Sequence, residues 1–121
     1  MAMNYTQLKN IPGFSWLGMN IGIKDDSLDF GIISSECKCS CAGVFTRNNL
    51  PGAPVIVGKK NIKNGQIQAI VVNSKNANVA TGKTGIRDAE KMCSLTGNAL
   101  GIDKDLVLPF STGVIGKHLP M

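Results

Sequence analysis

The strongest structural signal in this chain is a short apolar run near its middle, residues 67–72, with the sequence IQAIVV. A run of this length, rich in β-branched residues and bounded by Asn-Gly before it and a polar stretch after it, predicts a buried β-strand. Apolar residues make up 43% of the 121-residue chain, enough to bury a core around that strand. The chain is therefore one small domain or a piece of a larger one.

Strand patterns also precede this run. Apolar residues recur along residues 14–23, with an irregularity marked by Gly18, and again along residues 30–36 and 39–46. The stretch KDDSLD between the first two is typical of a turn rich in Asp and Ser. We therefore expect an N-terminal β-meander of three strands.

Two helices and a last strand complete the pattern. Pro54 suits the first turn of a helix that runs to about Ile62. A second helix is expected over about residues 86–100, because apolar side chains recur there at helical spacing and Gly101 follows as a C-terminal cap. Residues 105–111 form the last predicted strand.

This order of elements, a β-meander followed by α, β, α and β, predicts a mixed α/β fold of the α+β class, in which helices cover a layered sheet. Pro109, which has no N–H to donate, favours either an edge position for the last strand or a strand that is about to leave the sheet. Residues 1–121 are expected to form a single domain without internal repeats.

Charge and hydropathy exclude several classes of protein. The net charge of +5 comes from scattered lysines that form no dense block, and aromatic residues are only 5% of the chain. The charge is therefore interpreted as favouring solubility, and no nucleic acid is expected as a partner. No apolar run reaches the roughly 18 residues of a membrane span, and residues 1–13 lack the apolar core of a signal peptide. A cytoplasmic location and no membrane partner are expected.

Three of the four cysteines alternate in CKCSC, residues 37–41, so on a strand their sulfurs point to one face. A zinc site is disfavoured, because zinc cysteines usually form a knuckle with two residues between them, and only Cys93 and His118 remain as distant ligands. A disulfide within the trio is disfavoured because same-face positions on an extended strand are too far apart. Half-buried cysteines that pack as small apolar residues are preferred, and no metal or cofactor is expected.

The polar stretch of residues 73–85, NSKNANVATGKTG, is long for a loop inside a compact domain, and such loops are functional or are held by their own hydrogen bonds. Residues 77–84, ANVATGKT, fit a permissive phosphate-loop pattern. Nucleotide binding is nevertheless disfavoured: the strand ends well before the motif, Ala77 replaces a glycine, and no later strand ends in an Asp that could hold a metal.

The stretch STGVIG, residues 111–116, is the second candidate for chemistry. Two successive N–H groups at a tight Thr112-Gly113 turn can converge on one oxygen, as in an oxyanion hole, and the Thr112 hydroxyl can add a donor. The alternative is a plain turn that ends the strand. No general base is evident nearby, and His118 is more typical of an exposed turn.

Four blocks together carry a resemblance: AGVFTRNN with APV shortly after it, AIVVNSKNANVATG, TGIRDAEKM, and STGVIGKHLPM. In this order and spacing they resemble the N-terminal part of the ornithine acetyltransferase family, also called bifunctional glutamate N-acetyltransferase. The resemblance runs from about Phe14 to Met121. Each block alone is unspecific, whereas four in register are specific.

The resemblance implies an enzyme of arginine biosynthesis that moves an acetyl group from N-acetylornithine to glutamate, with some members also using acetyl-CoA. Members are made as a precursor that cleaves itself before an internal threonine, which then carries the acetyl group. By the same resemblance, Thr112 and Gly113 are catalytic residues that supply the oxyanion hole. The implied partners are the remaining α-segment and the β-segment of the same precursor, and the full enzyme is expected to be an oligomer.

The chain also departs from the family. Lys75 stands where the family has a small glycine, and Val79-Ala80 stand where it often has Ala-Cys, so Lys75 is expected to affect loop conformation or substrate access. The family's cleavage site, nucleophile and substrate-binding residues lie downstream of Met121. The chain is therefore expected to be incomplete relative to the full family fold and inactive alone. The alternatives are a non-catalytic, truncated, self-associating module and, less favoured, a nucleotide-binding domain that uses residues 77–84.

Overall fold

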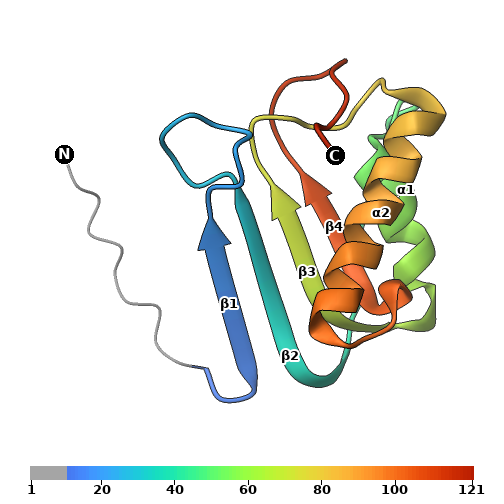
Figure 1. Ribbon diagram of the computed structural model, residues 1–121. Coiled ribbons are helices and arrows are strands. Elements are labelled where there is room, and N and C mark those ends of the chain that lie inside the picture. The colour runs from blue at the N-terminus through green and yellow to red at the C-terminus, as the bar shows by residue number, and fades with distance from the viewer. Residues whose placement is uncertain (1–10) are drawn as a thin grey trace.

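A computed structural model describes residues 11–121 (Figure 1). The expectation that residues 1–13 lack a signal peptide therefore falls largely outside the described part. Along residues 11–121 the elements are, in order, β1 (Phe14–Met19), β2 (Phe30–Ser40), α1 (Ala53–Asn61), a 3-10 helix (Ile62–Asn64), β3 (Gln66–Asn73), α2 (Gly82–Leu100), a second 3-10 helix (Lys104–Leu106) and β4 (Val107–Ser111).

The strands form one sheet in the order β1-β2-β3-β4 (Figure 1). β1, β2 and β3 are antiparallel neighbours, whereas β3 and β4 are parallel and are joined by α2 as a crossover. The edge position predicted for the strand that contains Pro109 is confirmed. Because β3 and β4 are parallel, their carboxyl ends lie at the same end of the sheet.

Both helices were predicted, and their ends show what the pattern missed. α1 has its proline in the first turn, as expected. α2 begins at Gly82, earlier than the predicted start near residue 86. The last residues of the polar stretch therefore belong to the helix. Gly101 caps α2 in a left-handed conformation with φ of 68°, and its N–H group contacts the carbonyls of the last turn.

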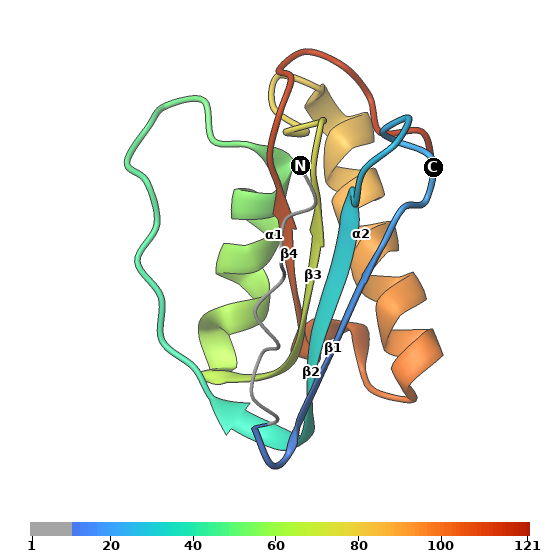
Figure 2. The same ribbon diagram turned by 90° about the vertical axis from the view of Figure 1, so that its left-hand side faces the viewer.

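The predicted third strand over residues 39–46 is wrong. β2 runs on to Ser40, whose partner Gln66 is the first residue of β3, so no neighbouring strand remains beyond this pair in the described chain. Residues 41–48 instead run as an irregular, drawn-out segment beside α1 (Figure 2). The first strand also ends at Met19, before the predicted residue 23.

The core lies between α2 and one face of the sheet, and α1 packs along β4 and against α2. In Figure 1 both helices lie at the β4 end of the sheet, away from β1. The apolar side chains that form the core come from β3, β4, both helices and the C-terminal segment: Ala53, Val57, Ala69, Val71, Ala89, Met92, Cys93, Val107 and Leu119. The mixed α+β class is confirmed. No helix in residues 11–121 is long and apolar enough to cross a bilayer.

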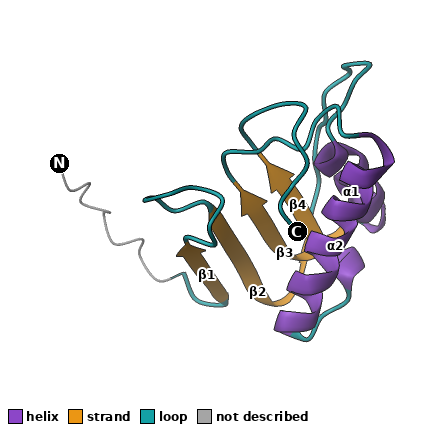
Figure 3. Ribbon diagram, turned by 45° about the horizontal axis from the view of Figure 1, so that its top comes forward, coloured by secondary structure: helices purple, strands orange, loops and turns teal. Residues whose placement is uncertain are grey.

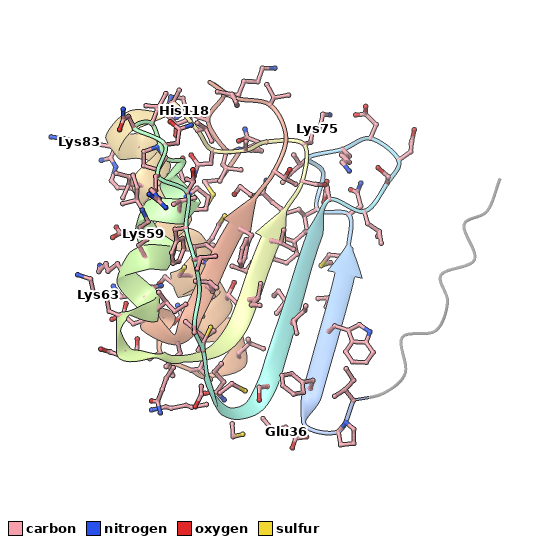
Figure 4. All side chains as sticks on the ribbon, turned by 180° about the vertical axis from the view of Figure 1, so that it is seen from behind. Glu36, Lys59, Lys63, Lys75, Lys83 and His118 are labelled. Carbon is pink, nitrogen blue, oxygen red and sulfur yellow. The ribbon has the colours of Figure 1, made fainter. Side chains whose placement is uncertain are left out.

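The other face of the sheet carries apolar side chains that no helix covers in residues 11–121, except near Leu108 of β4, which lies against Gly58 of α1 (Figure 4). The strand registers place Trp16 beside Ile33 and Val72 beside Phe110. These four side chains and Phe14 are each between 37% and 47% exposed. We call these five residues the open apolar face.

Candidate functional site

The turn after β4 lies beside the loop after β3, at the end of the sheet where both parallel strands finish (Figure 3). The Ser111 hydroxyl donates to Asn73 Oδ1 at 2.5 Å, and the Thr112 N–H donates to the Asn73 carbonyl at 3.1 Å. Asn73 Nδ2 in turn donates to the Asn76 carbonyl at 2.9 Å. One buried asparagine therefore joins the starts of both connections.

Two further buried asparagines hold the rest of the loop. Asn76 Nδ2 donates to both carbonyls of residues 117–118, at 3.1 and 3.0 Å. Asn78 is fully buried, its Nδ2 donates to the Gly85 carbonyl at 2.8 Å, and its Oδ1 accepts from the Thr81 hydroxyl at 2.7 Å. These side-chain amides satisfy buried polar groups that regular secondary structure would otherwise pair.

Backbone hydrogen bonds also join the two connections directly. The Val114 N–H donates to the Lys75 carbonyl at 3.0 Å, and the Ala77 N–H donates to the Val114 carbonyl at 2.9 Å. Further along, the Gly116 N–H donates to the Val79 carbonyl at 2.9 Å. The turn after β4 is therefore held along its length by the loop after β3.

Gly113 sits at the closest approach of the two connections. Its φ of 134° lies in a region that side chains rarely adopt, and a Cβ built there would lie 2.2 Å from the Lys75 carbonyl carbon. Backbone cannot move aside as a flexible side chain can. A glycine is required at this position so that the backbone can approach the loop.

The turn leaves a specific pair of donors open. Thr112 and Gly113 are exposed, and neither the Thr112 hydroxyl nor the Gly113 N–H has a hydrogen-bond partner within residues 11–121. Of the two successive N–H groups considered from the sequence, only that of Gly113 is open, because the Thr112 N–H donates to the Asn73 carbonyl. The donors available to an external oxygen are therefore one hydroxyl and one N–H group.

Two of the residues that depart from the family pattern are in left-handed backbone conformations. Lys75 has φ of 71° and Ala80 has φ of 57°. Such angles cost an L-residue free energy that a glycine does not lose. The Lys75 side chain is exposed at the end of the sheet (Figure 4), so its direct effect on the loop is through its backbone.

The phosphate-loop pattern of residues 77–84 does not form an open cradle of N–H groups. The Asn78 side chain fills the centre of the loop, and the Asn78 N–H donates to Asn76 Oδ1 at 2.8 Å. The Asn78 carbonyl accepts from the Ala53 N–H at 3.0 Å. The interior that a phosphate would need is occupied by the protein's own groups.

The cysteines show no metal-binding geometry. β2 shifts register between Ser34 and Cys39, which interrupts the regular alternation expected for the trio. Cys37 is exposed, whereas Cys39 and Cys41 are half-buried as predicted. Within residues 11–121 no three His, Cys, Asp or Glu side chains are arranged to hold a metal ion.

The fourth cysteine, Cys93, lies in the core between α2 and β4. Burial raises the pKa of its thiol to about 11, and the negative charges of Asp105 and Glu90 add to the effect. The Asn61 amide contacts the Cys93 sulfur at 3.8 Å. A buried thiol with a raised pKa is a packing residue and not a nucleophile.

The sequence analysis did not single out Asp29 or the individual asparagines of the loop. Asp29, the last residue of the stretch KDDSLD, is buried, and its carboxylate accepts the N–H groups of Ile21 at 2.8 Å and Lys24 at 2.7 Å. Burial raises the pKa of Asp29, but the backbone hydrogen bonds lower it by more than burial raises it. The pKa of Asp29 therefore lies below its ordinary value. For the asparagines of the loop, the available signal in the sequence was the repeated Asn of the polar stretch. His118 is exposed, as predicted.

The fold and the turn define a class: a mixed α+β domain with exposed donors at the carboxyl ends of two parallel strands. The model of the ArgJ family matches residues 15–121. The chain belongs to the ArgJ family, and the predicted resemblance to ornithine acetyltransferases is confirmed.

Relatives with this fold are longer than the chain. The arginine biosynthesis bifunctional protein ArgJ 2 of Clostridium acetobutylicum is 47% identical over 109 residues, which make up 90% of this chain and 28% of the relative. The protein ArgJ of Staphylococcus epidermidis is 51% identical over 110 residues, with the same two shares. The chain therefore spans 28% of the length of these relatives.

Two solved structures share the fold. The crystal structure of ArgJ from Bacillus halodurans matches with a TM-score of 0.88 and 40% identity, over 91% of this chain and 58% of that chain. The ornithine acetyltransferase of Mycobacterium tuberculosis, complexed with ornithine, matches with a TM-score of 0.87 and 34% identity, over 91% of this chain and 61% of that chain.

Proposed function

We propose that this chain is the N-terminal part of an acetyltransferase that moves an acetyl group from N-acetylornithine to glutamate. In this proposal Thr112 and Gly113 supply the oxyanion hole. The observation that supports it most is the pair of open donors, the Thr112 hydroxyl and the Gly113 N–H, in a turn held by Asn73. Membership in the ArgJ family supports the choice of reaction.

The chemistry needs such donors at two steps. A threonine hydroxyl from the remaining polypeptide attacks the acetyl carbonyl, the C–N bond to ornithine breaks, and the acetyl group becomes an ester on the enzyme. The amine of glutamate then attacks the ester and releases the threonine. Both steps pass through a tetrahedral oxyanion, which the two donors stabilise without reorganisation because the turn is already held in place.

The remaining polypeptide also has a docking surface in this proposal. Thr112 follows Ser111, the last residue of β4, so it lies at the end of the strand whose Phe110 belongs to the open apolar face. A segment that covers this face can therefore bring the nucleophile to the donors, and it removes apolar surface from water. The chain alone is expected to be inactive, and we place the complete enzyme in the cytoplasm.

The test is a pair of substitutions at Thr112 in the complete enzyme. Thr112→Val keeps the shape of the side chain and removes the hydroxyl, so kcat is expected to fall by about 100-fold while KM stays within threefold. Thr112→Ser retains the donor and is expected to keep most of the activity. A Thr112→Val enzyme with unchanged kcat would contradict the role. Gly113 substitutions are less informative, because an added Cβ meets the Lys75 backbone.

A further inference from the structure

The second half of β2 holds two cysteines in an irregular stretch of strand. The last regular pair before this stretch is Ser34 with Ala69, and the first pair after it is Cys39 with Ile67. Between these pairs β2 advances from residue 34 to 39 and β3 only from 69 to 67, so β2 carries three more residues than β3, and such a bulge bends a strand. The objection to a disulfide among the cysteines assumed a regular extended strand, and that assumption does not hold here.

The Ser35 hydroxyl lies between the sulfur atoms of Cys37 and Cys39. Its oxygen is 3.2 Å from Cys39 Sγ, which donates to it, and 4.0 Å from Cys37 Sγ. The same oxygen accepts the Cys37 N–H at 3.3 Å, so the backbone fixes its position. Cys39 Sγ also lies 3.6 Å from the Cys37 carbonyl oxygen. The two thiols are therefore gathered around one hydroxyl group.

The two cysteines also differ in exposure, which suits a reaction in which one thiol meets an oxidant before the other. Cys37 is exposed, and Cys39 is half-buried. Because the Ser35 oxygen accepts from the Cys39 thiol, its own proton is free to be donated to Cys37 Sγ. A hydrogen bond stabilises negative charge on a sulfur, and the thiolate is the form that oxidants attack. Cys37 is therefore placed to react first, with Cys39 beside it.

The other two cysteines lack this arrangement. The Cys41 thiol has no hydrogen bond to Ser35 within residues 11–121. Cys93 is buried, and its thiol donates to the Val107 carbonyl at 3.6 Å. Cys41 is thus a matched control in the same stretch of chain, and Cys93 is a thiol that an oxidant in solution does not reach.

We propose that Cys37 and Cys39 form an oxidation site, at which hydrogen peroxide converts the two thiols to a disulfide and the Ser35 hydroxyl positions them. The Cys37 thiolate attacks one peroxide oxygen: an S–O bond forms, the O–O bond breaks, and the leaving hydroxide takes up the proton lost by Cys37. The Cys39 sulfur then attacks the Cys37 sulfenic acid: an S–S bond forms, the S–O bond breaks, and the second hydroxide leaves with the Cys39 proton. The two sulfurs lose two electrons, and the peroxide is reduced to two waters.

The modification is expected to be reversible. A disulfide between residues 37 and 39 closes a very small loop at an exposed position, and strained, exposed disulfides are easily reduced. A dithiol such as dithiothreitol should therefore restore both thiols. The proposal goes beyond the acetyltransferase reaction and does not depend on it.

Mass spectrometry of the purified chain after treatment with hydrogen peroxide tests the site. The wild-type chain is expected to lose the mass of two hydrogen atoms and to regain it on addition of dithiothreitol. Cleavage after Lys38 separates the two cysteines, so the disulfide shows as two peptides that stay joined until reduction. The Cys41→Ser control is expected to react as the wild type does, which excludes residue 41 from the bond.

Variants of the two reacting cysteines test their order. Cys39→Ser is expected to stop at the sulfenic acid of Cys37, which dimedone traps with the mass of one adduct. Cys37→Ser is expected to consume peroxide roughly tenfold more slowly than the wild type, because the exposed thiol is gone.

Two substitutions of Ser35 test its positioning role. Ser35→Ala removes the shared hydroxyl and is expected to slow disulfide formation by about fivefold, whereas Ser35→Thr keeps the hydroxyl and the rate. The urea midpoint of both variants shows whether the fold is retained. A merely structural role of Ser35 would change that midpoint and not the rate of the folded chain.

Three outcomes would overturn the proposal. They are a wild-type chain that goes to sulfinic acid without forming a disulfide, a disulfide that joins any other pair of cysteines or two chains, and a Ser35→Ala variant that is oxidised as fast as the wild type. None of these outcomes bears on Thr112 or Gly113.

Discussion

The connection after β3 and the connection after β2 are both long and irregular, yet they are built in opposite ways. After β3, buried asparagines and cross-bonds occupy the backbone of residues 74–81, and that loop in turn holds the Thr112-Gly113 turn. After β2, the irregular segment of residues 41–47, which we call the strap, has no buried asparagine, and its N–H groups beyond Cys41 have no partner within the described chain.

The difference shows that irregular backbone can be either rigid framework or open surface, depending on where its polar groups are satisfied. A buried polar group without a partner costs about 1–3 kcal/mol, so a buried loop must supply its own partners. A surface segment needs no such partners, because water provides them until another strand does. Three substitutions, each with a matched control, test this comparison.

The largest effect is expected at the closest approach of the loop and the turn. Gly113→Ala places a Cβ 2.2 Å from the Lys75 backbone at a φ that alanine avoids, and should lower the free energy of unfolding by about 3 kcal/mol or more. Gly43→Ala in the strap is the control: its Cβ comes 3.0 Å from the end of the flexible Ile62 side chain and 3.6 Å from the Phe45 ring, and the change should stay within about 0.5 kcal/mol. Urea unfolding measures both, and similar losses would contradict the contrast.

The next effect concerns the asparagine network. Asn78→Ala removes the acceptor of Thr81 and the donor to Gly85 in a fully buried site, and should cost about 2 kcal/mol. Asn48→Ala, just beyond the strap, removes an exposed contact to the Leu50 N–H and should cost less than about 0.5 kcal/mol. Thermal unfolding of the two variants measures the difference. An Asn78→Ala variant as stable as the wild type would show that the asparagine network does not stabilise the loop.

The smallest effect is a gain in stability. Lys75→Gly removes the steric cost of the left-handed backbone at residue 75, but glycine also adds conformational entropy to the unfolded chain. The net effect of Lys75→Gly should be a stabilisation of about 0.5 kcal/mol. Lys83→Gly, the same change in the first turn of α2, should destabilise by about 0.5–1 kcal/mol. If both changes shift the unfolding midpoint in the same direction, the backbone explanation for Lys75 fails.

Most elements of the fold were predictable because they depend on local pattern. The apolar run of β3, the helical spacing of α2 and the proline at the start of α1 each act over a few residues. The wrong strand over residues 39–46 shows the limit of this reasoning. Its composition favours a strand, but a strand also needs a neighbour, and β3 begins at Gln66, opposite Ser40.

The candidate site was predictable in position and less so in chemistry. Thr112 and Gly113 were identified from a small-residue turn and a family resemblance. Asn73 determines which donors of Thr112 and Gly113 are open. It lies 39 residues before Thr112 in the sequence, and the two residues become neighbours only because β3 and β4 pair in parallel. No pattern within STGVIG reveals that one N–H group is already bonded.

By itself, the sequence determined the mixed α+β class, the succession of helices and strands, the edge position of Pro109 and the family. These features follow from propensity, periodicity and the order of short sequence blocks, all of which are local properties of the sequence. The tertiary structure alone decided that Thr112 offers its hydroxyl and not its N–H, that Gly113 must lack a Cβ beside Lys75, and that the strap has no neighbour. Each of these depends on which distant backbone lies within hydrogen-bond distance, and that is settled only when the strands pair.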